Sequence, residues 1–191
     1  IGYLNQPIYA GTTMVVFPRF DPGQYLQAIE KYEATAIGGA PQLFIPIVNH
    51  PDFKKYDLSS IKLVASGAAP LPVPVLEQML KSFPGVIGEG YGLTECTMCS
   101  NLNPPTREGL RPGSVGLPVA DTEVKIADLE TGTKKVPQGE VGELCIKGPQ
   151  VMQGYWNRPE ETAQALRGGW LYTGDIAKMD EDGYFYIVDR K

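Results

Sequence analysis

The first hundred residues alternate short apolar runs with segments in which apolar side chains recur every three or four positions. The runs predict strands at residues 13–17, 34–37, 61–65 and 86–90. The periodic segments predict helices that begin at residue 22, span 42–48 and include 76–83. Such alternation is typical of helices layered on a largely parallel sheet, so we expect an α/β region here.

The helix beginning at residue 22 has the clearest start signal. Asp21 can accept hydrogen bonds from free backbone N–H groups, and Pro22 at the first helical position loses no hydrogen bond. Leu26, Ile29 and Tyr32 follow at helical spacing and predict the buried face of this helix.

The pattern changes near residue 103, where a linker rich in proline and glycine begins. Beyond it we expect a hairpin turn at Asp182-Gly183, one helix at 159–166 capped by Asn157, and short strands at 115–116, 123–126, 142–147, 176–179 and 184–188. The chain therefore predicts two domains. Residues 1–102 form a layered α/β subdomain with a mostly parallel sheet, and residues 103–191 form a small antiparallel β-barrel-like subdomain.

The composition excludes several classes of protein. The 191 residues include 17 Lys and Arg against 22 Asp and Glu, and a net charge of −5 without basic clusters excludes a nucleic-acid-binding surface. The apolar runs are too short to cross a bilayer. Three cysteines are an odd number and favour a reducing compartment, so we expect a cytoplasmic location. Neither end has the features of a natural terminus, and we expect a longer protein.

The segment 89–95 follows a predicted strand and combines side chains that suit different parts of a nucleotide. Its glycines let the backbone approach a ligand, its tyrosine offers a ring face to a base, its threonine can donate to a phosphate, and its last glutamate can bind Mg²⁺. These residues are Gly90, Gly92, Tyr91, Thr94 and Glu95. A tight strand-to-helix turn with no ligand explains the glycines equally well.

A second segment, 169–175, has a carboxylate directly after a glycine turn. The two oxygens of Asp175 could accept hydrogen bonds from a ribose diol, although an ordinary turn residue is the alternative. Cys96 and Cys99 have the spacing of a metal or redox pair, but without a second pair we expect them to pack as small apolar residues. We expect Trp156 and Trp170 to belong to the core of the second domain.

The two polar segments, in this order and followed by residues 182–190, resemble the adenylate-forming superfamily of acyl-CoA synthetases, luciferases and peptide-synthetase adenylation domains. Within it the chain looks most similar to bacterial long-chain fatty-acyl-CoA synthetases, through residues 89–96, 113–118 and 142–152. The resemblance covers essentially the whole chain. It implies an enzyme that joins a fatty carboxylate to ATP, giving acyl-AMP and pyrophosphate, and then transfers the acyl group to coenzyme A.

The resemblance also implies roles for individual residues. Tyr91 would stack on adenine, Thr94 would bind phosphate, and Glu95 would bind Mg²⁺, with Thr94 and Glu95 as the catalytic pair. Asp175 and Arg190 would hold the ribose. The adenine and acyl pockets would be lined by backbone around Gly67, Ala68 and Ala69, together with Glu89, Gly90 and Gly92.

Two segments of the superfamily are not found among these residues. The phosphate loop ending in Pro-Lys-Gly should lie upstream of Ile1, and the hinge and catalytic lysine should follow Lys191. We therefore expect the isolated chain to be inactive. Two alternatives stay open, a non-catalytic nucleotide- or acyl-binding module and a ligase for another carboxylic acid.

Three further expectations concern the acyl group and the protein surface. Gly88 and Gly90 could leave a channel for an alkyl chain. Alternatively, glycine at these two positions could reflect strand packing alone. A fatty substrate suggests peripheral contact with a membrane. Exposed apolar surface in the first region suggests self-association.

Overall fold

The computed structural model describes residues 2–106 and 108–190, and the chain folds into two compact units. The first unit is Ile1–Glu89 with Pro104–Gly113, and the second is Gly90–Asn103 with Ser114–Lys191. The chain thus passes between units within one strand, at Glu89 and Gly90, and the proline-rich segment after residue 103 packs with the first unit. The domain boundary near residue 103 stays a prediction.

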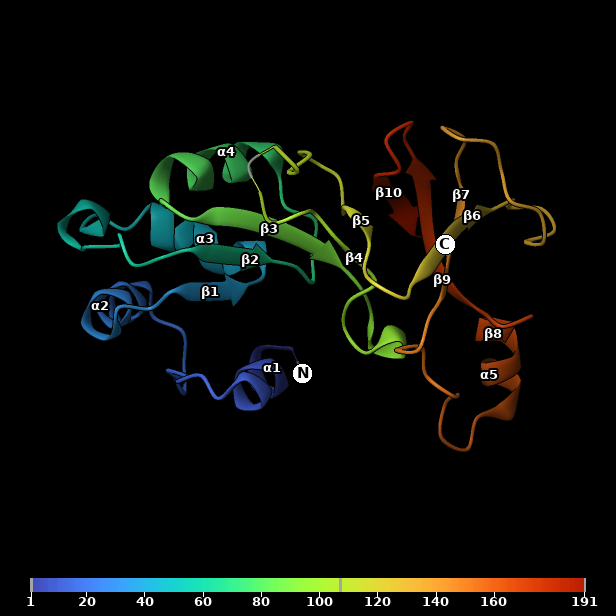
Figure 1. Ribbon diagram of the computed structural model, residues 1–191, viewed down its shortest axis with the longest axis horizontal. Coiled ribbons are helices and arrows are strands. Elements are labelled where there is room, and N and C mark those ends of the chain that lie inside the picture. Colours follow the sequence, from blue (N-terminus) through green and yellow to red (C-terminus); the bar gives the residue numbers. More distant parts are fainter. Residues whose placement is uncertain (1, 107, 191) are drawn as a thin grey trace. The chain divides into compact units, whose positions relative to one another are not determined.

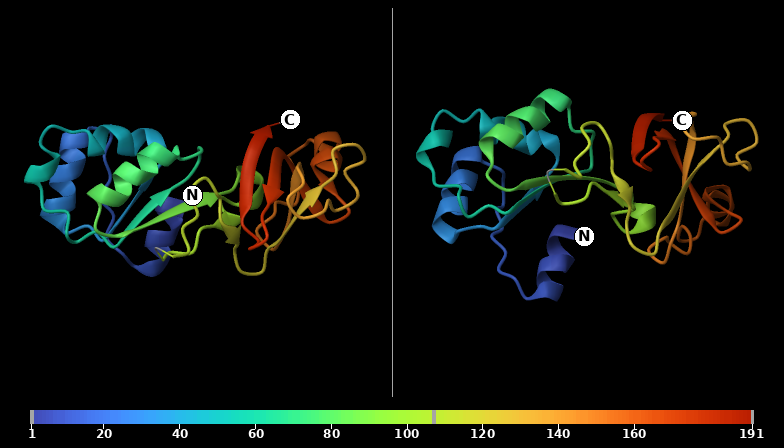
Figure 2. Two further views of the ribbon diagram at one scale, coloured as in Figure 1. Left: turned by 90° about the horizontal axis from the view of Figure 1, so that it is seen from above. Right: turned by 45° about the horizontal axis from the view of Figure 1, so that its top comes forward.

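The first unit is a parallel sheet covered by helices. Its strands are β1 (Ala36–Gly39), β2 (Leu63–Ser66) and β3 (Val86–Tyr91), paired in that order. Helices α2 (Pro22–Tyr32), α3 (Pro41–Val48) and α4 (Val73–Ser82) lie side by side on one face of these strands, and α1 (Gly2–Ala10) stands apart from them (Figures 1 and 2). A short 3₁₀ turn, η1, spans Phe53–Lys55. This arrangement confirms the predicted α/β layering.

Helix α2 begins where the sequence predicts. Asp21 Oδ1 accepts from Gln24 N over 2.8 Å, Pro22 follows it, and the helix ends at Glu33 in the left-handed conformation. Leu26 and Ile29 are fully buried, each contributing about 1.5–3 kcal/mol to folding. Tyr32 was expected on the same face, and this is wrong because its ring, at the last turn of the helix, is 53% exposed beneath Lys31.

Residues 13–17 form no strand, contrary to expectation. Apolar β-branched residues become a strand only when a neighbouring strand accepts their backbone hydrogen bonds, and no described strand pairs with this segment. Val16 is 78% exposed there. Strand β1 also starts two residues later than predicted, at Ala36.

The second unit is antiparallel. The end of β3 pairs with β4 (Asn101–Leu102), which pairs with β5 (Leu117–Pro118). A second sheet has the order β10-β9-β7-β6, with β8 paired to β9 (Figure 1). Its strands are β6 (Glu123–Ala127), β7 (Gly142–Lys147), β8 (Leu166–Arg167), β9 (Trp170–Met179) and β10 (Phe185–Arg190). The mixed α/β class with a parallel and an antiparallel part is therefore confirmed.

The hairpin between β9 and β10 turns at Asp182-Gly183 as predicted. Asp180 N donates to Tyr184 O over 2.9 Å, and Gly183 has a φ of +85°, which favours glycine. The core beneath this sheet is formed by buried side chains of β7, β9 and β10, among them Leu144, Ile146, Leu171 and Phe185.

Two predictions for the second unit are wrong in detail. Val115 and Gly116 lie outside the strands, Gly116 making only an isolated bridge to Phe185, and strand β5 begins at Leu117. Helix α5 (Pro159–Ala165) is not capped by Asn157, because Arg158 occupies the cap position without a side-chain bond. Proline at the first helical position has no N–H, so this helix end has one unpaired donor fewer even without a cap.

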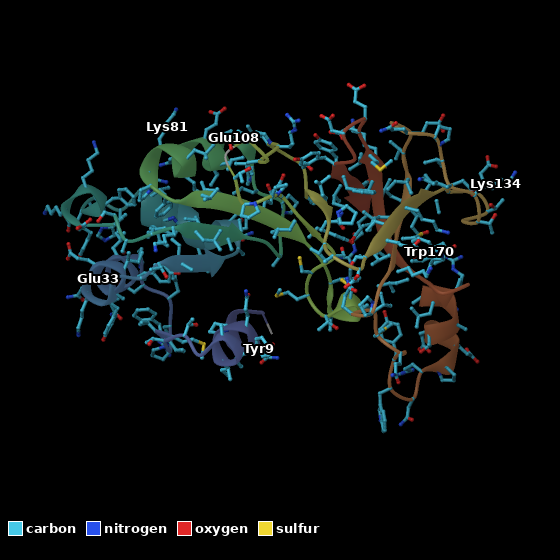
Figure 3. The ribbon with its side chains drawn as sticks, viewed as in Figure 1. Tyr9, Glu33, Lys81, Glu108, Lys134 and Trp170 are labelled. Carbon is cyan, nitrogen blue, oxygen red and sulfur yellow. The ribbon has the colours of Figure 1, made fainter. Side chains whose placement is uncertain are left out.

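The two tryptophans differ in burial. Trp156 is 90% exposed, so its placement in the core is wrong, since it lies in the loop before α5 where no described element covers it. Trp170, labelled in Figure 3, is half-buried on β9. Lys125 Nζ lies 4.4 Å from the centre of its ring. Among the described residues, no helix has the length and apolar character needed to span a membrane.

Candidate functional site

The glycine-rich segment leaves β3 and enters a 3₁₀ turn, η2 (Thr94–Cys96). A Cβ added to Gly92 would lie 1.7 Å from the carbonyl oxygen of Met98, and one added to Gly90 would lie 3.2 Å from that of Asn101. Gly92 is thus required by the chain's own turn, because its backbone runs against another backbone segment. The fold accounts for this glycine without a ligand.

Tyr91 and Asp175 are joined by a hydrogen bond. The Tyr91 hydroxyl donates to Asp175 Oδ2 over 2.5 Å, linking two segments that are 84 positions apart in the sequence. Burial of the phenol, with the Asp175 contact as a second cause, raises the pKa of Tyr91, so this hydroxyl stays protonated and remains a donor. The structure therefore brings together one residue from each of the two predicted polar segments.

Arg190 lies on the other side of the same carboxylate. Its Nε is 3.5 Å from Asp175 Oδ1, and the two residues are cross-strand partners on β10 and β9. The side chain of Asp175 is mostly buried, whereas that of Arg190 is 78% exposed. The carboxylate of this ion pair therefore lies within the protein, and its guanidinium faces solvent. Tyr91, Asp175 and Arg190 form one cluster in the second unit.

A bulge within β9 sets the position of Asp175. The sequence suggests a turn before this residue, which is wrong, because Trp170–Met179 is one continuous strand. Gly174 has a φ of +75°, and the pairing of β9 with β7 shifts register between Glu143 and Cys145. Such a bulge re-aims the side chain that follows it.

Glu143 supports this bulge and was not identified from the sequence. Its side chain is buried on β7, and its Oε1 accepts from Gly174 N over 3.0 Å. Thr173 Oγ1 donates to Leu144 O over 2.8 Å in the same region. A glutamate within an otherwise apolar strand was the signal that could have pointed to Glu143.

Glu95 is held by a second tyrosine. The Tyr155 hydroxyl donates to Glu95 Oε1 over 2.7 Å, and this bond raises the pKa of Tyr155 to about 12. Thr94, beside it in η2, is exposed. Nothing in the sequence around Tyr155 points to this contact, which joins residues 60 positions apart.

Glu95 is the one residue that the sequence predicts as a metal ligand. The described residues form no group of three or more His, Cys, Asp and Glu suited to a metal ion.

The remaining predicted residues belong to the first unit. Gly67, Ala68 and Ala69 follow β2 in a loop whose strained point is Ala68, with a φ of +66°. Glu89 is buried in register with Ser66, and its Oε1 accepts from Leu71 N over 3.0 Å, which fixes the far end of the loop. Burial raises the pKa of Glu89 to about 7.

The three cysteines are free thiols. Cys96 is fully buried in the core of the second unit, which confirms its packing role. Cys99 is half-buried, and its Sγ lies 3.4 Å from the carbonyl oxygen of Asn101.

A family model described as AMP-binding enzyme matches residues 1–156. The chain belongs to the family of AMP-binding enzymes. It is 47% identical over 188 residues to a long-chain-fatty-acid–CoA ligase of Bacillus subtilis, covering 98% of this chain and 33% of the relative. It is 45% identical over 178 residues to the corresponding ligase of Escherichia coli O6:H1, covering 93% and 31%. The resemblance to adenylate-forming enzymes is therefore confirmed.

Among solved structures, the anthranilate CoA ligase AuaEII in complex with anthranoyl-AMP matches with a TM-score of 0.89 and 32% identity, covering 98% of this chain and 36% of that one. The chain thus spans about a third of the length of the AMP-binding relatives it matches.

Proposed function

We propose that this chain belongs to an AMP-forming ligase that activates a fatty acid and transfers it to coenzyme A. The observation that carries the proposal is the hydrogen bond between Tyr91 and Asp175, because it joins the two segments expected to bind one nucleotide. The relatives named long-chain-fatty-acid–CoA ligase support the fatty substrate. Since the chain spans about a third of their length, the proposal concerns the whole protein.

The reaction has two balanced steps. A carboxylate oxygen of the fatty acid forms a bond to the α-phosphorus of ATP, and the bond from that phosphorus to pyrophosphate breaks. The thiol sulfur of coenzyme A then forms a bond to the acyl carbon, AMP leaves with the electron pair of the acyl–oxygen bond, and the thiol proton passes to solvent. A fatty carboxylate is ionised near neutral pH and needs no general base, so the protein must chiefly orient the reactants and offset their charge.

The residues of the second unit receive the nucleotide in this proposal. The Tyr91 ring packs on adenine, the Asp175 carboxylate accepts from the ribose hydroxyls, and Arg190 secures that carboxylate from the solvent side. The Thr94 hydroxyl donates to a phosphate oxygen. The resemblance to the family assigns the lining of the adenine and acyl pockets to the backbone around Gly67, Ala68 and Ala69, with Glu89 and Gly90, and Gly92 shapes the turn.

Glu95 fits the requirements of Mg²⁺. Protein-bound Mg²⁺ usually takes one or two carboxylates and completes its shell with water and substrate phosphates, so a single carboxylate suffices. The carboxylate of Glu95 is partly exposed, and its bonded donor, the Tyr155 phenol, is uncharged. When bound, Mg²⁺ would neutralise phosphate charge, which an acidic protein cannot do by itself.

Coenzyme A enters the proposal only as the acceptor of the acyl group. Peripheral membrane contact is an extension of the fatty substrate. Self-association is an extension of exposed apolar side chains in the first unit, among them Leu4, Ile8, Tyr9, Val15, Val16 and Phe20. Neither is needed for the ligase reaction.

The proposal is tested by ATP–pyrophosphate exchange with the full-length protein, using saturated fatty acids of increasing length beside anthranilate and ferulate. We expect exchange with fatty acids and a loss of about tenfold or more in kcat/KM for ATP in Asp175→Asn. Preference for the aryl acids would favour a ligase for another carboxylic acid. Nucleotide binding without exchange for any acid would favour a non-catalytic module.

The 191-residue chain provides the companion measurement. It contains neither the phosphate loop ending in Pro-Lys-Gly nor the lysine expected after the hinge, so we expect no pyrophosphate exchange from it alone. Exchange by the isolated chain would contradict this part of the proposal.

A further inference from the structure

One loop, residues 148–155, holds both the side chain and the backbone of Glu95. The Tyr155 hydroxyl donates to Glu95 Oε1 over 2.7 Å, and Met152 N donates to the carbonyl oxygen of Glu95 over 2.7 Å. Because the two bonds reach Glu95 from donors three positions apart, they fix the direction of its side chain as well as its backbone.

This loop is itself anchored at both ends. On one side, Thr97 Oγ1 donates to Gln150 O over 2.7 Å, and the Gln150 amide donates to Thr122 Oγ1 over 2.7 Å. On the other side, Tyr155 N donates to Thr162 Oγ1, in helix α5, over 2.9 Å. The Tyr155 hydroxyl is therefore presented to Glu95 from a backbone that cannot shift freely.

We propose that Tyr155 is a positioning residue whose hydroxyl holds the Glu95 carboxylate in the orientation needed to bind a divalent cation together with ATP. The inference rests on the proposed function, in which Glu95 is the carboxylate ligand. A phenol suits this task because it donates one hydrogen bond without cancelling the negative charge, as Lys or Arg would. Glutamate loses much rotamer freedom when it binds a metal ion, so fixing it in advance raises the affinity.

The test measures how strongly Mg²⁺ improves nucleotide binding by the full-length protein. The dissociation constant of the non-cleavable α,β-methylene analogue of ATP is determined by calorimetry in Mg²⁺ and again in EDTA, and their ratio is the magnesium enhancement. Removing an outer partner of a metal ligand usually costs 10–100-fold in metal affinity, so we expect Tyr155→Phe to lower the enhancement about tenfold. The dissociation constant of the analogue measured in EDTA should be the same in Tyr155→Phe as in the wild type.

Tyr186→Phe is the matched control. Its hydroxyl also donates to a carboxylate, Asp180 Oδ2 over 2.9 Å, but within the β9–β10 hairpin. This variant loses the same type of bond and should keep the full magnesium enhancement. In steady-state assays, Tyr155→Phe should need about tenfold more Mg²⁺ for half-maximal rate and should keep its kcat at saturating Mg²⁺, a split that a general loss of structure would not produce.

Glu95→Gln completes the experiment. It should lower the enhancement at least as far as Tyr155→Phe, and adding Tyr155→Phe to it should have no further effect. An enhancement within twofold of wild type in Tyr155→Phe, or an equal loss in the Glu95→Gln background, overturns this inference while the ligase proposal stands. Failure of the wild-type protein to bind the analogue in either buffer overturns the proposed function and the inference with it.

Discussion

Tyr91 and Asp175 meet through a hydrogen bond of 2.5 Å although they are 84 positions apart in the sequence. The contact joins the end of β3 to the bulged part of β9, so each residue restrains the segment that carries the other. The carboxylate of Asp175 also faces Arg190 at 3.5 Å. One phenol therefore links the packing of the second unit to the residue expected to hold the ribose.

Tyr91→Phe should weaken both folding and nucleotide binding. The substitution keeps the ring but removes the donor to a mostly buried carboxylate, and a hydrogen bond to a charged group contributes about 1.5–3 kcal/mol. We expect the free energy of unfolding to fall by about 2 kcal/mol in urea denaturation of the full-length protein. A double-mutant cycle with Asp175→Asn isolates the pair, and a coupling energy below about 0.5 kcal/mol would contradict the linkage.

Gly92→Ala should destabilise the protein severely. Its Cβ would overlap the backbone of Met98, which cannot move aside as a flexible side chain would, so we expect a loss of about 3 kcal/mol or more in the free energy of unfolding. Thermal and urea unfolding measure it. A stable Gly92→Ala variant with weakened nucleotide binding would instead indicate that the glycine serves a ligand.

Gly88→Ala is the matched control, on strand β3, which ends one residue before Gly92. A Cβ at residue 88 would lie 3.9 Å from Leu63 Cδ1, an ordinary contact, so stability should change by less than about 1 kcal/mol. The same variant tests the expected alkyl channel. If Gly88 lines it, the preferred acyl chain should become shorter in the exchange assay, and an unchanged preference would leave the glycine as a packing residue.

Exposed apolar side chains should make the 191-residue chain self-associate. Ile8 and Tyr9 on α1 are 63% and 95% exposed, and Val16 is 78% exposed. Tyr9 is labelled on α1 in Figure 3. We expect the sedimentation coefficient to rise with concentration, and Ile8→Lys with Val16→Lys to reduce the rise. Gln27→Lys, at an exposed polar position of α2, controls for added charge. A monomer at all concentrations would contradict the prediction.

Local signals were enough to predict elements that stabilise themselves. Asp21 and Pro22 mark the start of α2, and Asp182-Gly183 marks the β9–β10 turn, because capping and turn chemistry act between residues a few positions apart. The run at 13–17 was wrongly predicted as a strand, since strand formation depends on a partner that the run itself does not reveal.

Some residues of the candidate site could be predicted from local sequence signals, and others could not. Tyr91, Glu95 and Asp175 could be selected because each lies in a recognisable segment of polar and glycine residues. Tyr155 could not, because its contact with Glu95 joins a loop to a turn 60 positions away. Glu143 could be noticed as a glutamate in a mostly apolar strand, but its contact with Gly174, 31 positions away, could not be predicted. The bulge at Gly174 was also missed, since glycine before a polar residue predicts a turn as readily as a bulge.

Glu89 should make folding depend on pH in the neutral range. Burial raises the pKa of its carboxyl from an ordinary value of 4.5 to about 7 in the folded chain. Between these values the folded state keeps a proton that the unfolded state has lost, so stability is full below about pH 4.5 and falls as the pH rises through 7. The effect over this range is about 3 kcal/mol.

Glu89→Gln should remove this dependence, because the amide is neutral at every pH and its oxygen can still accept from Leu71 N. Urea unfolding of the full-length protein between pH 5 and 8.5 is compared for wild type, Glu89→Gln and the control Glu77→Gln on α4. The stability curves of wild type and Glu89→Gln should lie close together near pH 5, move apart as the pH rises to 7, and keep a constant separation above pH 7, with the variant more stable there. Parallel curves would mean that Glu89 is ionised throughout and that its burial is offset by other contacts.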